Sequence, residues 1–394
     1  MKSMEKNNLI SDFYEKIKII TPNDSYHYFF GYYDMRATGN GINLRHLAHR
    51  VKFMDRLPDE NDVCELGYLE DGRFYKIAET TAWNFQQGAM LQYHPNKENT
   101  VFYNVCENGR FMTVTHNLEN DEKLYTDMAT ASISPNGLLG LSLNFGRIFA
   151  FRAGYGYAGF KDKNENIKAP TDDGVFLTDM QSGKSKLLVS YQDMRAEAGF
   201  GEDEKILVNH ITFAPSSERY VMLVRNFYNG INRRWKTSLV IGDVHGNIKT
   251  VIKKSIVSHY FWLSDKELLL YATPGNNPQK VYILNVDTGA AKALESEYFD
   301  KKENSDIHCT ITPDRKYVIG DGYPIDGYRH ILAINLETGE SKSILKAKTV
   351  IPECPDIRCD LHARYVFNEK FVSFDTTHNG RREIAIFPVS EIKA

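Results

Sequence analysis

Short apolar segments, separated by turns rich in Gly, Pro, Asn and Asp, follow one another along most of this chain. Their length and their content of Val, Ile, Tyr and Phe predict β-strands rather than helices. One strand–turn–strand unit, residues 209–224, has counterparts at 258–271, 307–319 and 361–374. Each of the four units has a histidine as its second residue: His210, His259, His308 and His362.

The spacing of these histidines predicts the architecture. It is 49 residues from His210 to His259, 49 from His259 to His308 and 54 from His308 to His362. A period of about 40–50 residues built from short strands is typical of a β-propeller. With three weaker units nearer the N-terminus, the sequence predicts an all-β, seven-bladed β-propeller that forms one domain over residues 1–394.

Three segments stand apart from the repeat. Residues 1–15 form a polar lead, and residues 144–173 form a long insertion in blade three that we expect either to cover a substrate or to be a plain insertion. Residues 191–206 are expected to form a partly helical connection. The last blade ends one strand short, so we predict that residues 16–20 pair as its outer strand and close the ring, which removes an exposed sheet edge.

The repeat also indicates where a site would lie. Equivalent positions in successive blades form a ring around one axis, so the four imidazoles are expected to converge on the central channel. Blade two is expected to begin near Gln86. Blades two and three carry Met90 and Thr130 at the position of the histidines, so the ring of histidines is biased to the second half of the chain. A lone histidine is most often a core residue, but four in register favour a shared functional site.

Composition and net charge limit the classes of partner that the protein is expected to bind. The chain has 394 residues with 48 Lys and Arg against 51 Asp and Glu, a net charge of −3, which argues against a nucleic-acid-binding surface. Its five cysteines are odd in number and scattered, which is typical of reduced thiols. We find no apolar run of signal-peptide or membrane-helix length and expect a cytoplasmic protein with no membrane partner.

The histidine units resemble the oligogalacturonate lyase-like propellers. The likeness rests on Asn209-His210, on Ser258 to Trp262, on the unit from His308 to Gly322 and on the His362 unit. The N-terminal half, with residues 28–34 and 152–157, is more similar to relatives near the ulvan-lyase propellers. The resemblance implies a lyase with a histidine base and a divalent metal, usually manganese, otherwise calcium or zinc.

By position, the resemblance implies that His210 is the base and that His259 and His362 hold the metal. We add His308, at the same repeat position, as a third candidate ligand. The sequence departs from the family at two places, because a histidine ligand falls on Arg364 and a glutamine ligand falls near Cys359. Arginine stays protonated and does not ligate metals, so Arg364 is expected to supply positive charge directly.

A uronate lyase removes the proton at C5, beside the carboxylate, and expels the oxygen at C4. It must neutralise the carboxylate and place a base within hydrogen-bond reach of C5. We therefore expect an anionic oligosaccharide substrate. The candidate catalytic residues are His210, Arg225, Tyr157 and Arg364, the candidate substrate-binding residues are His27, Tyr33, Gln87, Arg152 and Tyr155, and the candidate metal ligands are His259, His308 and His362.

Two other functions remain open from the sequence. A non-catalytic propeller that binds a glycan or a protein would lack an inward cluster of imidazoles and basic groups. A glycoside hydrolase would need two carboxylates that flank the bond, for which Asp34, Asp321 and Asp375 are candidates at strand ends.

Overall fold

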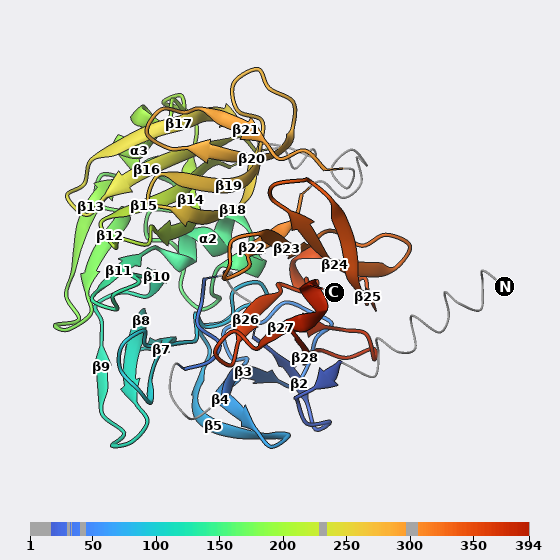
Figure 1. Cartoon of the computed structure of the whole chain (residues 1–394). Coiled ribbons are helices and arrows are strands. Elements are labelled where there is room, and N and C mark those ends of the chain that lie inside the picture. Colours follow the sequence, from blue (N-terminus) through green and yellow to red (C-terminus); the bar gives the residue numbers. More distant parts are fainter. Residues whose placement is uncertain are drawn as a thin grey trace.

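Seven antiparallel sheets of four strands each are arranged around a common centre (Figure 1). The structure, a computed structural model, describes residues 17–29, 32, 34–39, 45–227, 235–296 and 306–393. The sheets follow one another along the chain as the blades of a propeller, as the repeat predicted. No helix in these ranges is long and apolar enough to cross a membrane.

Each blade runs from an inner strand beside the axis to an outer strand. Blade one contains β2 (Tyr26–Tyr28), β3 (His46–Val51), β4 (Cys64–Glu70) and β5 (Arg73–Thr80). Blade two contains β6 (Gln92–Tyr93), β7 (Thr100–Glu107), β8 (Arg110–Asn117) and β9 (Lys123–Tyr125). Blade three contains β10 (Thr130–Ile133), β11 (Leu139–Ser142), β12 (Gly174–Asp179) and β13 (Ser185–Ser190). Blade four contains β14 (Ile206–Phe213), β15 (Arg219–Asn226), β16 (Thr237–Asp243) and β17 (Ile248–Ser255).

The second half of the ring repeats the same plan. Blade five contains β18 (Val257–Ser264), β19 (Glu267–Ala272), β20 (Lys280–Asn285) and β21 (Ala291–Ala293). Blade six contains β22 (His308–Ile311), β23 (Tyr317–Asp321), β24 (Tyr328–Asn335) and β25 (Ser341–Lys348). Blade seven contains β26 (Arg364–Val366), β27 (Phe371–Thr376) and β28 (Glu383–Pro388), followed by the helix α5 (Ser390–Lys393).

The ring closes through the N-terminal strand. β1 (Lys18–Ile19) pairs antiparallel with β28, with Lys18 opposite Ile386 and Ile19 opposite Ala385. The Ile20 N–H continues this pairing and donates to the carbonyl of Ile384 at 3.0 Å. β1 is thus the outer strand of blade seven, which confirms the closure predicted from the missing fourth strand.

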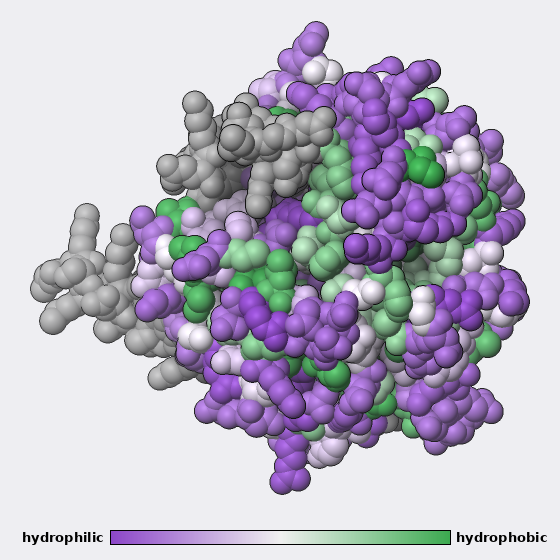
Figure 2. Space-filling view, turned by 180° about the vertical axis from the view of Figure 1, so that it is seen from behind, coloured by the Kyte–Doolittle hydropathy of each residue, from purple (hydrophilic) through white to green (hydrophobic). Residues whose placement is uncertain are grey.

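The apolar core consists of layers between neighbouring blades. One layer joins Val221 and Leu223 of blade four to Leu268 and Leu270 of blade five, and similar layers join blades five to six and six to seven. On the face turned away in Figure 1, apolar side chains gather towards the middle and hydrophilic ones cover the rim (Figure 2). The blades are therefore held side by side by burial of their sheet faces.

The insertion in blade three is folded. It begins with the helix α2 (Phe145–Phe151), whose N-cap Asn144 accepts a hydrogen bond from the Arg147 N–H, and continues into the short helix η1 (Ala153–Tyr155). The buried guanidinium of Arg147 lies 2.8 Å from the Asp162 carboxylate and also donates to the carbonyl of Ile206. Asn144 also donates to Asp173, so the two ends of the insertion are joined to each other.

Other connections agree only in part with the sequence. The helix α3 (Tyr191–Glu197), capped by Ser190, confirms a helical connection after blade three. Blade two was expected to begin near Gln86, but its first strand begins at Gln92 because residues 84–88 form a turn. Asn84 Oδ1 accepts the N–H groups of Gln86 and Gln87, and Gly88 has a φ of +60°, so an extended strand cannot pass through here.

Candidate functional site

A cavity of about 260 Å³ lies where the inner strands meet. Segments far apart in the sequence contribute to it, including the chain after β2, the turn after β10, η1, and the inner strands of blades four, five and six. The described residues that line it are Tyr32, Asp34, Gln86, Gln87, Pro135, Tyr155, His210, Thr212, Phe213, Pro215, Ser258, His259, Tyr260, Phe261, Trp262, His308, Arg358 and His362. All four histidines of the repeat are among them, so the imidazoles do converge on one space near the axis.

The inner strands of blades four and five are irregular where their histidines lie. In β14 the pairing with β15 shifts between Val208 and His210, and in β18 the pairing with β19 shifts between Val257 and Tyr260, on either side of His259. Bulges of this kind bend a strand locally and change the direction of a side chain. We attribute the presence of both imidazoles in the cavity to these irregularities.

His210 is held by an aromatic and amide network. Its Nδ1 lies 2.9 Å from the hydroxyl of Tyr32, and that hydroxyl also lies 3.0 Å from the side-chain nitrogen of Gln87. The ring of Tyr155 stands edge-on to the imidazole at 5.8 Å between centroids. Burial, assisted by the positive charge of Arg225, holds the pKa of His210 well below its ordinary value of 6.5. The imidazole is therefore neutral at neutral pH.

Two guanidinium groups surround the phenol of Tyr155. Arg358 donates to the Tyr155 hydroxyl at 3.2 Å, and Arg152 lies over the Tyr155 ring at 4.5 Å from its centroid. Burial alone would raise the pKa of Tyr155, but Arg358 and Arg152 reverse this and hold it below its ordinary value. Arg152 is anchored by Asp356 at 2.6 Å. The result is a comparatively acidic phenol beside a neutral imidazole.

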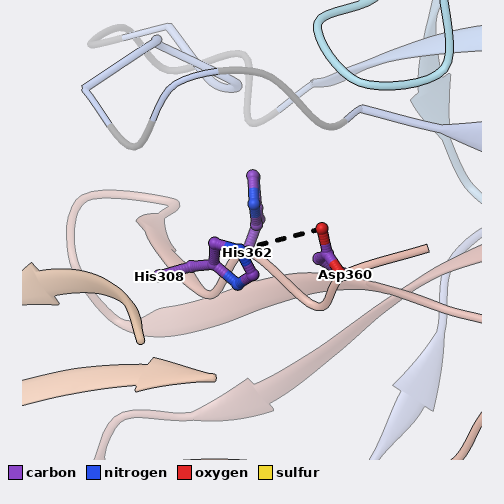
Figure 3. A group of neighbouring side chains, drawn as sticks. All are labelled: His308, Asp360 and His362. Carbon is purple, nitrogen blue, oxygen red and sulfur yellow. Dashed lines mark ion pairs between the residues drawn. The ribbon is translucent and has the colours of Figure 1, made fainter. Parts of the chain in front are cut away.

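A second cluster lies in blades six and seven. One ligand atom from each of His308, Asp360 and His362 lies within 4.8 Å of the others, and all three residues are buried (Figure 3). His308 Nε2 lies 3.8 Å from Asp360, and its Nδ1 lies 3.3 Å from Asp321. Burial opposes protonation of His308, but Asp321 and Asp360 outweigh it and raise the pKa of this imidazole.

The buried carboxylate of Asp360 also forms two ion pairs. Arg358 Nε lies 2.8 Å from its carboxylate, and Arg329 forms a second pair with it. Although burial opposes ionisation, Arg329 and Arg358 hold the pKa of Asp360 far below its ordinary range. Asp360 is therefore charged, and it connects the histidine cluster to the Arg358–Tyr155 pair.

The backbone around His362 is shaped by Asp321. The carboxylate of Asp321 accepts the N–H groups of Leu361 and His362, each at 2.9 Å. His362 has a φ of +45°, a left-handed conformation that non-glycine residues rarely adopt. The two hydrogen bonds compensate this strain and fix the imidazole beside His308.

Of three other predicted residues, one lines the cavity and two are not among its lining residues. His259 lines the cavity, and its Nδ1 lies 2.7 Å from Asp306. Arg225 is buried behind the cavity wall, where it donates to Thr237 and to the carbonyl of Val257. Arg364 donates to the carbonyl of Tyr32 and lies over the ring of Phe29.

Three further candidates do not reach the cavity or cannot be placed. Tyr157 is fully buried, stacks on Phe145 and accepts a hydrogen bond from Asn104, so the structure does not bring it to the cavity. His27 is buried in β2 of blade one, 3.5 Å from Asp24, and is also not brought there. Tyr33 lies outside the described residues.

Sequence reasoning missed Tyr32, Arg358 and Asp360. All three lie outside the strand repeat, so the spacing of the repeat did not indicate that they belong to the site. For Arg358 and Asp360 the available signal was the run of charged residues just before His362. For Tyr32 it was the aromatic segment that also contains Tyr33, one residue away.

No family model matches this chain, and no curated protein sequence matches it. Among solved structures it is similar to an oligogalacturonate lyase in complex with manganese, with a TM-score of 0.64 and 12% identity over 95% of this chain and 94% of that chain. An oligogalacturonate lyase from Vibrio parahaemolyticus gives a TM-score of 0.62 and 14% identity over 95% of this chain and 93% of that one.

The fold is also shared with a protein of different activity. The tricorn protease gives a TM-score of 0.50 and 9% identity over 96% of this chain and 34% of that chain. At sequence identities of 9–14%, these similarities show a shared fold and not a shared activity. The chain has the propeller fold of oligogalacturonate lyases, which confirms at the level of the fold the resemblance carried by the histidine units.

Proposed function

We propose that this protein is a lyase that cleaves uronic-acid-containing oligosaccharides by β-elimination. The observation that carries the proposal is the pairing of a neutral imidazole, His210, with a phenol of lowered pKa, Tyr155, in one cavity flanked by guanidinium groups. Elimination needs a base and an acid in the same site with positive charge close by. The likeness to oligogalacturonate lyases supports the same reaction class.

Each residue has a defined task in this proposal. Arg358 and Arg152 bind the uronate carboxylate and stabilise the negative charge that develops beside C5. His210 takes the C5 proton, the electrons of that bond form the C4–C5 double bond, and the bond from C4 to its oxygen breaks. Tyr155 gives its proton to the leaving oxygen.

The histidine–aspartate cluster fits a divalent metal. Two imidazoles and a carboxylate are donors that such ions use, and the spacing of His308, Asp360 and His362 within 4.8 Å suits one ion. Asp321 behind His308 provides the carboxylate–histidine arrangement that orients metal ligands. A bound ion would supply further positive charge for the uronate carboxylate. It would share Asp360 with Arg329 and Arg358.

The hydrolase alternative finds less support. Asp375 accepts the Phe29 N–H at 2.7 Å and Asp321 accepts two backbone N–H groups, so both carboxylates are engaged in the fold. Among the described residues, Asp34 is the one carboxylate that lines the cavity. A hydrolase needs a pair of carboxylates across the bond.

The test is a screen of uronate oligosaccharides by ultraviolet absorbance, because elimination creates a conjugated double bond and hydrolysis does not. Unsaturated product from at least one uronate is the expected result. New reducing ends without absorbance would instead indicate hydrolysis. Binding without any product would indicate a non-catalytic propeller.

A further inference from the structure

The hydroxyl of Tyr32 makes three contacts that together restrict where its proton can lie. It lies 3.0 Å from Nε2 of Gln87, 3.2 Å from the carbonyl oxygen of Asn209 and 2.9 Å from Nδ1 of His210. A phenol has one proton to donate and two lone pairs that accept. The Gln87 amide N–H is a donor, and the backbone N–H of Ile211 also acts on this hydroxyl as a donor. Neither donor can take the phenol proton, which is therefore left for Asn209 or His210.

The carbonyl of Asn209 can only accept, so it needs the phenol proton. Asn209 has no paired residue in β15, because the register shifts between Val208 and His210, and its carbonyl oxygen faces the Tyr32 hydroxyl. The phenol oxygen then presents no proton towards Nδ1 of His210, so Nδ1 must be the donor in this contact. In the opposite arrangement, with the phenol donating to Nδ1, two oxygens would face each other at 3.2 Å with no proton between them.

We infer that Tyr32 is a positioning residue that holds neutral His210 with its proton on Nδ1, so that Nε2 carries the basic lone pair and opens into the cavity. Among the described residues, none hydrogen-bonds to Nε2, and His210 lines the cavity. The side of the imidazole that meets substrate is thereby fixed before substrate arrives. The catalytic consequence rests on the proposed elimination, whereas the position of the proton does not.

The surroundings keep the phenol in this role. Burial raises the pKa of Tyr32 well above its ordinary value, so the hydroxyl stays protonated across the working range. Gln87 is itself fixed because its backbone N–H donates to Asn84 at 2.7 Å. Tyr32 therefore acts through His210, and it comes from a segment 178 residues away in the sequence.

The test is the nitrogen NMR spectrum of the full-length protein labelled with ¹⁵N-histidine, without substrate. The two neutral tautomers and the cation give distinct ¹⁵N shifts and proton couplings, and the His210 signals are assigned by their loss in His210→Ala. We expect wild-type His210 to be mainly protonated on Nδ1. A wild-type ring protonated mainly on Nε2, or on both nitrogens at neutral pH, would overturn the inference, and this spectrum requires no destabilising variant.

The matched variants are Tyr32→Phe and Tyr260→Phe. Tyr260 lines the same cavity, but its hydroxyl contacts Thr212 and not His210. Tyr32→Phe should move the proton to Nε2, which can donate to water in the cavity, while Tyr260→Phe should leave the tautomer unchanged. An unchanged tautomer in a folded Tyr32→Phe protein would also overturn the inference.

Activity gives a separate result. With a uronate that is cleaved, Tyr32→Phe should lower kcat by about tenfold to a hundredfold, with KM little changed, because binding groups are retained and the base is misaligned. An equal change in kcat and KM would contradict the positioning role. If the wild-type tautomer is as expected but no uronate is cleaved, the tautomer inference holds and the proposed function fails.

Discussion

At the residue scale, the surroundings shift the pKa of the same side chain in opposite directions in two parts of one cavity. His210 is kept neutral by burial and by the positive charge of Arg225. His308 meets two carboxylates, and these raise its pKa in spite of burial. The sequence places both histidines at the same repeat position, yet only the neighbours supplied by the fold decide which one can act as a base.

Replacement of His210 by alanine should abolish formation of unsaturated product, a loss of at least about a hundredfold, since general-base catalysis contributes on this order. Because the pKa of His210 lies well below 6.5, its neutral form persists on the acidic side of that value, and the wild-type rate should not fall as pH decreases through 6.5. The measurement is the initial rate by ultraviolet absorbance across a pH series. His330→Ala, in β24 and outside the cavity, is the control that should retain activity.

His49 leads to a prediction about stability. Its Nε2 accepts the Ala89 N–H at 2.9 Å, and burial lowers its pKa from 6.5 to about 3. Between these values the unfolded chain binds a proton that the folded chain does not, so the free energy of unfolding falls as pH decreases below 6.5. Each such histidine contributes a slope of up to about 1.4 kcal/mol per pH unit.

The variant His49→Gln tests this prediction by urea unfolding at a series of pH values. It should be less stable than wild type at neutral pH but should show a shallower decline on acidification. Parallel curves for the two proteins would show that His49 is not responsible for the slope.

At the element scale, a few local hydrogen bonds hold together pieces that are distant in sequence. β1 joins the first described residues to the last strand, and the Arg147–Asp162 pair anchors the insertion that carries Arg152 and Tyr155. Removal of one partner from a buried ion pair leaves an uncompensated charge. The position of the proposed acid therefore depends on the helix α2, which lies outside the strand repeat in the sequence.

Ring closure can be tested at Ile20, whose N–H donates to the carbonyl of Ile384. Ile20→Pro removes this donor and should lower the free energy of unfolding by about 1–3 kcal/mol, because the carbonyl of Ile384 loses its partner. Ile20→Val keeps the N–H and should stay close to wild type. Equal urea midpoints for the two variants would contradict a stabilising role for this pairing.

At the scale of the whole molecule, the cavity depends on complete closure. Its walls come from Tyr32 near one end of the described chain, from Tyr155 in the insertion, and from Arg358 and His362 in the last blade. Closure of the ring between blades one and seven brings Tyr32, near the start of the described chain, to the same cavity as Arg358 and His362, near its end. No single blade holds both the proposed base and the proposed acid.

The metal proposal belongs to this scale because its ligands come from two blades. Protein treated with chelator should lose activity and regain it with Mn²⁺, and Mn²⁺ should raise its Tm because it binds only the folded state. Asp321→Asn, behind His308, should weaken Mn²⁺ binding about 10–100-fold. Glu65→Gln, which faces Arg50 on blade one, should leave binding unchanged. A wild-type protein that takes up no Mn²⁺ at elemental analysis would refute the metal site.

The structure agrees best with the predictions from sequence where the strand and turn pattern of a short segment determines its fold. The hairpins of blades four to seven and the pairing of β1 follow from strand pattern and turn residues. Gln86 was misplaced in a strand because the polar contacts of Asn84, which form the turn, have no periodic signature. Tyr157 was placed beside Tyr155 as a candidate, but the chain turns after η1 and directs it into the core.

By itself, the sequence determined that this chain is a seven-bladed propeller and that four histidines face one axis. The alternation of strands and turns and the spacing of the repeats are sufficient for both conclusions, because neither depends on how individual side chains pack. Only the tertiary structure decided which of these imidazoles has a lowered pKa and which has a raised pKa. It also decided that Tyr32, Arg358 and Asp360 join them. Burial and the approach of charges from other blades set these properties, and neither is encoded in the neighbours along the chain.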